Sequence, residues 1–436
     1  MNSEEEHVIP SWLEENWERL EEVGKKLTGG EVNKGSRPKI QKIPLYMAER
    51  MEFRRYYEPQ LMSFGLYHLS KQQLLQGKRY KDLWTAMYLQ NTNQRVRDLH
   101  LRIRQHDWRP FYQYVELSRD SDTRETISVY GNPRSKDDFV AGVLMLDGCC
   151  VLQLLEKSSS IDPEQELKIS IDKLVRVHQD LLVMDNQIPF QVLRLLCEDE
   201  ARLKKCLQNF LQVHGIERTP KLGKKENKST HNGQQEAQEI EVIVQGDDQQ
   251  DKHEDEEDPV HLLDYLRKAL LMRDRNTIHK EVEIKIKRRS LHLRKYRIGT
   301  IQELKAAGIR VKKHLCNNVV YPNFNNGILK LPVLTVDGTT AYIFLNLVAY
   351  EMCPDFHNNF EISSFLVFMS SLIDQPEDVK ELRMAGVIIN ELASDKEVAD
   401  LFNKMDSILV PETLLFAEIR DQIHSHFESK RGRIKH

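Results

Sequence analysis

The stretch Asp180–Phe190, DLLVMDNQIPF, decides how this chain folds. Four apolar residues run directly into Asp185 and Asn186, and Pro189 leads into a second apolar run. Asp and Asn side chains bond the backbone groups that a helix end leaves free. We therefore expect a corner between two buried helices, with Asn186 as the N-cap of the second helix and Pro189 within its first turn. Because apolar runs flank Asp185 and Asn186 on both sides, we expect this corner to lie in the core and not to form a catalytic loop.

Upstream of the corner, Phe139–Glu156 is apolar nearly all round, which predicts a central buried helix. Asp147 is the residue of this helix whose burial costs free energy, because a buried carboxylate must be paired or hydrogen-bonded. No second carboxylate or base lies beside it at helical spacing, so a capping or network role is favoured over that of a catalytic acid. Cys149 and Cys150 point about 100° apart on a helix, which favours packing over a metal or redox site.

Composition bounds the class of protein. The chain has 436 residues, of which 40% are hydrophobic and 30% charged, and a formal net charge of −4. These values suit a protein with a real core and no global attraction to nucleic acid or acidic lipid. The six cysteines are scattered without a CxxC pair, as in a cytosolic protein with reduced thiols. The first residues, MNSEEEHVIPSW, are acidic and have no apolar core of signal-peptide length, and the longest apolar stretch, Phe139–Leu155, is expected to be too short and too polar to span a bilayer.

Outward from the corner the pattern is mainly α-helical, with a small β-sheet or hairpin insertion near residues 309–337. Ile309–Val311 alternates, and Ile328–Val336 is extended, with Pro332 marking an edge or a bend. Asn326-Gly327 and Asp337-Gly338 signal turns. The predicted helices after the corner cover residues 201–213, 261–271, 300–308, 340–352, 360–373, 377–392, 394–405 and 411–427. Before it, helices are predicted over 73–89 and around a stripe of Val96, Leu99 and Ile103.

Domain organisation follows from shifts in composition. Residues 1–37 should hold an N-terminal helix and a polar linker, and residues 38–428 a single large domain. Two segments interrupt that domain: a polar insertion at 215–258, expected to be disordered, and a basic linker at 280–299. The insertion is basic in its first part and acidic in its last, with one apolar patch at Ile240–Val244. Residues 429–436 form a basic tail.

No local motif assigns a catalytic, cofactor-binding or metal-binding residue. GxSxG, HExxH, strand-linked GxGxxG and EF-hand patterns are absent, and no cofactor is expected. His314 and Cys316 are close in sequence but lack a third ligand for zinc. Four arginines lie to the sides of the apolar stripe of Val96, Leu99 and Ile103, namely Arg95, Arg97, Arg102 and Arg104. A solvated face is favoured for them over an anion-binding site. The basic stretch 280–297 has one aromatic residue, which favours a linker over nucleic-acid binding.

Five blocks occur in the order, and roughly the spacing, of a known plant family, and the similarity covers nearly the whole chain from Pro38 on. They are LMLDGC at Leu144–Cys149, the corner at Asp180–Phe190, ELKAAGIRVK at Glu303–Lys312, NLVAYEMC at Asn346–Cys353 and SDKEVADLFNKM at Ser394–Met405. The chain thus resembles the plant domain-of-unknown-function family 247. The resemblance implies a mostly helical plant protein with no established catalytic activity. Family members usually carry one C-terminal transmembrane helix, and some grass members are associated with self-incompatibility, which suggests recognition of a partner protein.

Two departures from the family pattern matter. The tyrosine–histidine–histidine tract is reduced here to Tyr67-His68-Leu69, which weakens the idea of a paired-histidine site. The sequence stops at Arg431–His436, about where the family's basic juxtamembrane segment leads into its membrane helix. Either this member has lost the anchor or the sequence is truncated, and as written we expect a cytoplasmic or peripheral membrane protein.

The leading functional hypothesis is a non-enzymatic protein-interaction or recognition module at or near a membrane, with another protein as its partner and no nucleic acid. The alternatives are an enzyme of unrecognised type that uses Asp147 or Glu351, and nucleic-acid binding through residues 280–297.

Overall fold

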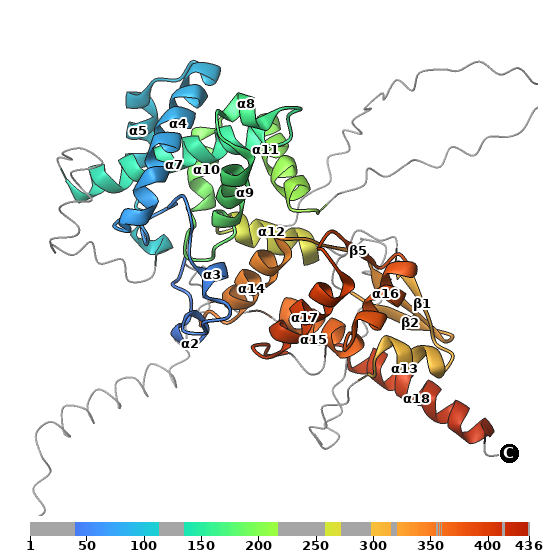
Figure 1. The fold of residues 1–436 in the computed structure, drawn as a ribbon. Helices are drawn as coiled ribbons and strands as arrows, with labels where there is room; N and C mark the ends of the chain where they lie inside the picture. Colours follow the sequence, from blue (N-terminus) through green and yellow to red (C-terminus); the bar gives the residue numbers. More distant parts are fainter. Residues whose placement is uncertain are drawn as a thin grey trace, which may run out of the picture.

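The computed structural model describes residues 40–112, 135–216, 258–271, 298–314, 321–354, 356, 358, 360–411 and 415–434. The predicted N-terminal helix, nearly all of the polar insertion and of the basic linker, and Cys316 lie outside these residues. The described part is mainly helical with two small sheets, as predicted. One group of helices precedes residue 217, and a second group with the sheets follows residue 298, while α12 and α14 lie between the two groups (Figure 1).

The first group is built around α7 (Lys136–Lys157), the predicted central helix. Most of its residues are buried, and α4, α5, α10 and α11 pack against it. Gly148 permits the close approach of α10, because a Cβ there would lie 2.4 Å from Leu196 Cδ1. The helices of this group besides α7 are α4 (Lys78–Thr92), α5 (Val96–Arg104), α8 (Pro163–Leu167), α9 (Ile171–Asp180), α10 (Phe190–Leu196) and α11 (Glu200–Val213).

Within the described residues, α7 alone is long and apolar enough to cross a membrane. However, 78% of its apolar window is buried inside the protein, and the core helix of a soluble protein passes the same test. The apolar composition of α7 is explained by its contacts with the surrounding helices.

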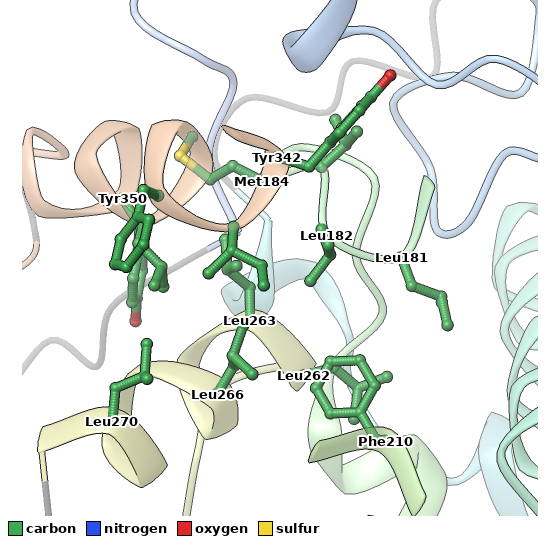
Figure 2. Packing of buried hydrophobic residues seen from close by; sticks show 14 of the residues in the cluster. Leu181, Leu182, Met184, Phe210, Leu262, Leu263, Leu266, Leu270, Tyr342 and Tyr350 are labelled. Carbon is green, nitrogen blue, oxygen red and sulfur yellow. The ribbon is translucent and has the colours of Figure 1, made fainter. Parts of the chain in front are cut away.

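The predicted corner is confirmed as the turn between α9 and α10, and residues 181–190 are all buried. The predicted cap is wrong. Pro189, with φ −56°, occupies the N-cap position of α10, so it precedes the first turn rather than lying within it. Asn186 faces a different part of the chain, described below. Figure 2 shows side chains of the corner, such as Leu182 and Met184, meeting those of α12 (Leu262–Leu271) and α14 (Thr340–Glu351) in one apolar cluster.

The C-terminal group joins helices to the two small sheets. Strand β3 (Ile328–Pro332) lies between β1 (Arg310–His314), which is parallel to it, and β2 (Asn323–Asn325), which is antiparallel. After a bend at Val333 the chain forms β4 (Leu334–Val336), which pairs in parallel with β5 (Ile388–Asn390). The helices of this group are α13 (Ile301–Ala306), α15 (Glu361–Leu372), α16 (Pro376–Met384), α17 (Asp395–Asp406) and α18 (Ala417–Ile434).

Three predicted boundaries differ from the structure. The helix expected over 377–392 ends at Met384, because Gly386 adopts φ +69° and β-branched residues then pair with β4 as β5. The helix expected from residue 73 begins with a 3₁₀ segment, η1 (Gln72–Gly77), before α4. The last helix continues to Ile434, into the predicted basic tail. The remaining short elements are α2 (Leu45–Ala48), α3 (Arg54–Tyr57) and η2 (Arg109–Phe111).

Phe190, the first residue of α10, anchors the corner against α12. Its side chain is buried and stacks on Tyr265 with ring centroids 6.2 Å apart, and its N–H donates to Val260 O at 2.8 Å. Phe190→Ala is expected to lower the free energy of unfolding by about 3–5 kcal/mol, because it leaves a cavity. Urea unfolding measures the loss. Phe190→Leu keeps most of the volume and should lose clearly less, so equal losses in both variants would contradict this account.

Candidate functional site: a buried polar hub

Residues 61–65 cross the interior without forming a helix or a strand. All five are buried, so their backbone N–H groups need partners inside the protein. The acceptors come from α7, from the end of α9 and from the corner. Two more polar side chains join them, because Lys81 of α4 pairs with Asp147 and Asp185 contacts His68. We call this set the polar hub: Lys81, Asp147, Asp180, Asp185 and Asn186.

Asp180, the last residue of α9, binds the start of this segment. Its Oδ1 accepts from Gln60 N at 2.6 Å, and its Oδ2 accepts from Leu61 N at 2.9 Å and Met62 N at 2.7 Å. Burial raises the pKa of Asp180 to about 7, although the three N–H donors act in the opposite direction. The carboxyl group therefore serves as an acceptor for backbone that has no regular structure of its own.

Asn186 binds the same segment at Phe64, two residues after Met62, the last residue that Asp180 binds. Its Oδ1 accepts from Phe64 N at 2.7 Å, while its Nδ2 donates to Met62 O at 3.1 Å and to Asp180 O at 2.9 Å. The bond to Asp180 O satisfies a carbonyl at the end of α9, so Asn186 caps the helix before the corner rather than the helix after it.

Asn186→Ala is expected to lower the free energy of unfolding by about 3 kcal/mol, instead of the roughly 1 kcal/mol of a lost exposed cap. Three hydrogen bonds disappear together, and the N–H of Phe64 is left buried without an acceptor. Urea unfolding of the variant tests this value. Asp199→Ala, which removes the exposed cap of α11, is a matched control expected to lose only about 1 kcal/mol. Similar losses in the two variants would contradict the network role.

Asp147 completes the hub from the middle of α7. Its Oδ2 accepts from Gly65 N at 2.8 Å, and its Oδ1 accepts from Lys81 Nζ of α4 at 2.5 Å. Both charged side chains are almost wholly inaccessible to solvent. Burial raises the pKa of Asp147, while Lys81 and the Gly65 N–H lower it. The predicted buried-network role fits this geometry.

Gly65 is where the segment passes closest to the corner. Its φ is +69°, and a Cβ would lie only 2.2 Å from Gln187 O. Only glycine fits such an approach. Three residues later, His68 Nε2 lies 2.7 Å from Asp185 Oδ1, and both side chains are buried. His68 is therefore part of the same internal network.

A second buried network holds Glu351, the other predicted candidate acid. Its carboxylate accepts from Ile362 N and Ser363 N, both at 2.9 Å, and so caps the N-terminus of α15. Arg267 of α12 bridges Glu351 at 3.2 Å and Glu361 at 2.6 Å. Like the Asp147 carboxylate, the Glu351 carboxylate uses its oxygens in hydrogen bonds and an ion pair that join separate helices.

A small cavity of about 40 Å³ lies elsewhere, between the end of α11 and the start of β4. His214 lines it together with Thr335, Asp337 and Thr340. This volume has room for about one water molecule and not for a metabolite. Asp337 Oδ1 accepts from Thr339 N and Thr340 N, so this carboxylate is engaged by its own turn.

Buried neutral histidines make stability depend on pH. Burial lowers the pKa of His178 and of His261 to about 4, so the folded state disfavours the proton that the unfolded chain binds near pH 6.5. Stability present above pH 6.5 is therefore lost as pH falls toward 4, by roughly 2 kcal/mol per histidine at pH 5.

The variant His261→Asn isolates one of these groups. His261 precedes α12 and its Nδ1 accepts from Asp264 N at 3.1 Å, a role that Asn performs well. The loss of unfolding free energy between pH 7.5 and pH 5 should be about 2 kcal/mol smaller in the variant than in the unchanged chain. Urea titrations at the two pH values measure it, and an identical pH dependence would show that His261 is not held neutral.

The remaining sequence candidates do not form a site. Cys149 and Cys150 are free and buried, and burial raises the pKa of Cys149 to about 12, which makes a reactive thiolate unfavourable. Arg102 and Arg104 form ion pairs with Glu198 and Asp138, so part of the arginine face is paired rather than solvated. Among the described residues no three His, Cys, Asp or Glu side chains converge as metal ligands.

The sequence did not reveal three members of these networks. Lys81, Asp180 and Arg267 were not singled out, although each is buried and charged. A usable signal existed for Lys81, which lies one turn before Trp84 and Thr85 on the buried side of α4. A charged residue among buried positions of a helix needs a partner from elsewhere.

Comparison with known proteins identifies the family of this chain. The family described as "Plant protein of unknown function", domain-of-unknown-function family 247, matches residues 40–436. UPF0481 protein At3g47200 of Arabidopsis thaliana is 24% identical over 362 residues, which cover 82% of this chain and 70% of that protein. A second UPF0481 protein of Arabidopsis thaliana, At3g02645, is 34% identical over 110 residues, or 25% of this chain and 21% of that protein. No solved structure matches the chain. The chain therefore belongs to this plant family of unknown function.

Proposed function

We propose that this protein is a non-enzymatic interaction module that binds another protein at or near a membrane. One observation carries the non-enzymatic part: the buried carboxylates with catalytic potential bond the chain itself. Both oxygens of Asp147 and of Asp180 accept hydrogen bonds, and Glu351 caps α15 and pairs with Arg267. Catalysis requires such groups to face a substrate pocket. Proximity to a membrane is drawn from the family resemblance.

An exposed apolar surface supports binding of a protein. Leu45 and Tyr46 of α2, and Met51 just after it, are exposed by 75%, 62% and 80%. Arg50 and Arg54 lie beside them in sequence. Large apolar side chains with neighbouring arginines are typical of interface centres. We call Leu45, Tyr46 and Met51 the α2 patch.

Proximity labelling in plant cells tests the proposal. The full chain is compared with the double variant Leu45→Glu/Met51→Glu, and with Met384→Glu as a control at an equally exposed apolar residue of the second group. The unchanged chain and the control should label the same membrane-associated protein. In the double variant that labelling should fall at least about tenfold, while its free energy of unfolding stays that of the unchanged chain. Equal labelling by all three chains, or metabolite turnover by the purified protein, would contradict the proposal.

A further inference from the structure

Strand β1 is an edge strand with an open side. It pairs only with β3 among the described strands, and lies at the outer rim of the C-terminal group (Figure 1). Arg310 N donates to Gly327 O, so alternate residues from Arg310 direct their backbone groups toward β3. The N–H and C=O groups of Val311 and Lys313 therefore point to the open side. Such an edge is a template for another extended segment.

The face of this sheet that is turned to solvent is strongly basic. Arg310 and Lys312 of β1 are exposed, and Lys312 is directly opposite Lys330 of β3. None of these three has an ion-pair partner among the described residues. Like charges opposite each other on neighbouring strands are destabilising. On the opposite face, Val311 is in register with the buried Leu329 and the exposed Lys313 with the buried Leu331, so this face is apolar apart from the Lys313 ammonium. A strand added to β1 would fit if it carried acidic residues on one face and β-branched residues on the other.

The insertion contains such a segment at Glu239–Gln245, EIEVIVQ. In an extended conformation Glu239 and Glu241 share one face, and the residues between and after them, Ile240, Val242 and Val244, share the other. The chain enters the insertion beside the sheets, since a Cβ at Gly215 would lie 4.0 Å from Thr335 Cβ of β4. Roughly two dozen residues separate Gly215 from Glu239, and an unstructured chain of that length would span about 27 Å, comparable to the length of β3 and β4 together.

We propose that Glu239–Gln245 of the same chain docks on the open side of β1 as an additional strand. Its glutamates then lie over Arg310 and Lys312, and its β-branched residues extend the apolar face that begins at Val311. The insertion is thereby fastened to the C-terminal group. The rival segment is Glu281–Lys287, EVEIKIK, which also alternates. Its Lys285 and Lys287 would meet the basic face with like charge, so electrostatics favours Glu239–Gln245.

Residue-resolved hydrogen exchange on the full chain tests the proposal. The amides of Val311 and Lys313 should be protected in the unchanged protein and exchange at least about tenfold faster in Val242→Pro, because proline removes a strand donor. The amide of Arg310, which bonds to β3, should keep its rate and serves as the internal reference. Ile284→Pro is the matched control in the rival segment. Unchanged exchange in Val242→Pro, or faster exchange only in Ile284→Pro, would overturn the proposal.

A charge exchange gives an independent readout. Glu241→Lys should raise the exchange rate of the Val311 amide about tenfold, and adding Lys312→Glu to it should restore most of the protection, because opposite charges again face each other. Lys312→Glu alone should also raise the exchange rate of the Val311 amide. If the double variant exchanges as fast as Glu241→Lys alone, these two residues do not face each other and the proposed register is wrong.

Discussion

Asp147→Asn is expected to lower the free energy of unfolding by about 3–5 kcal/mol. The variant keeps an oxygen for Gly65 N but removes the carboxylate charge that pairs with the buried Lys81 ammonium. Removing one partner of a buried ion pair is strongly destabilising for this reason. Urea unfolding monitored by tryptophan fluorescence measures the loss, since Trp84 lies one turn from Lys81 on α4.

The double variant Lys81→Met/Asp147→Asn is the control for the charge. It removes both charges and keeps an acceptor for the backbone of Gly65, so its loss should be well below the sum of the two single losses. Lys78→Met, which removes the partially exposed i,i+4 partner of Asp82 on the same helix, should cost less than about 1 kcal/mol. Additive losses for Lys81 and Asp147 would mean that the two groups do not act as a pair.

Helix positions could be predicted from the sequence because apolar periodicity is local. The central helix around Asp147 and the turn between α9 and α10 follow from runs of residues that each face the core, and both are confirmed. The helix predicted over 300–308 is present as α13, and it begins with a capping box of Thr300 and Glu303, whose chemistry depends only on residues three apart. Strand β5 was missed since its three residues continue a helical pattern, and its strand partner lies some fifty residues earlier.

The polar hub could not be predicted, for a different physical reason. Its bonds join residues that are far apart in sequence, such as Gly65 with Asp147 and Phe64 with Asn186. Periodicity shows that a polar residue is buried but not which group satisfies it. Asn186 illustrates the limit: as a residue at a helix corner it indicates a cap, and only the fold shows that its amide holds the backbone of residues 62–64.

The hub and the α2 patch are connected through the chain. Residues 60–65 follow α3 directly, and Asn346 of α14 donates to Tyr56 O while accepting from Met184 N of the corner. The corner thus fixes the position of the segment that carries the exposed residues Leu45, Tyr46 and Met51. A change in the hub should weaken binding at this surface even though no hub residue is exposed, because an ordered interface requires an ordered support.

Asp180→Ala is expected to lower the free energy of unfolding by about 4 kcal/mol. The substitution leaves the N–H groups of Leu61 and Met62 buried without acceptors, at about 1–3 kcal/mol each, and also removes the acceptor of Gln60 N. Local opening should accompany the loss, so the amides of Leu61 and Met62 should exchange with solvent at least about tenfold faster.

Asp172→Ala is the matched control at the other end of α9. Asp172 is exposed in the first turn, where its carboxylate has a hydrogen bond with Ser170 and a favourable interaction with the helix dipole, so its loss should change stability much less than the loss of Asp180. Labelling at the α2 patch, measured as in the interaction test above, should fall in Asp180→Ala and persist in Asp172→Ala. If Asp180→Ala retains both its stability and the slow exchange of Leu61 and Met62, the three bonds to Asp180 do not hold this segment in solution. A variant that keeps its stability but loses amide protection would instead show that the segment opens without unfolding the core.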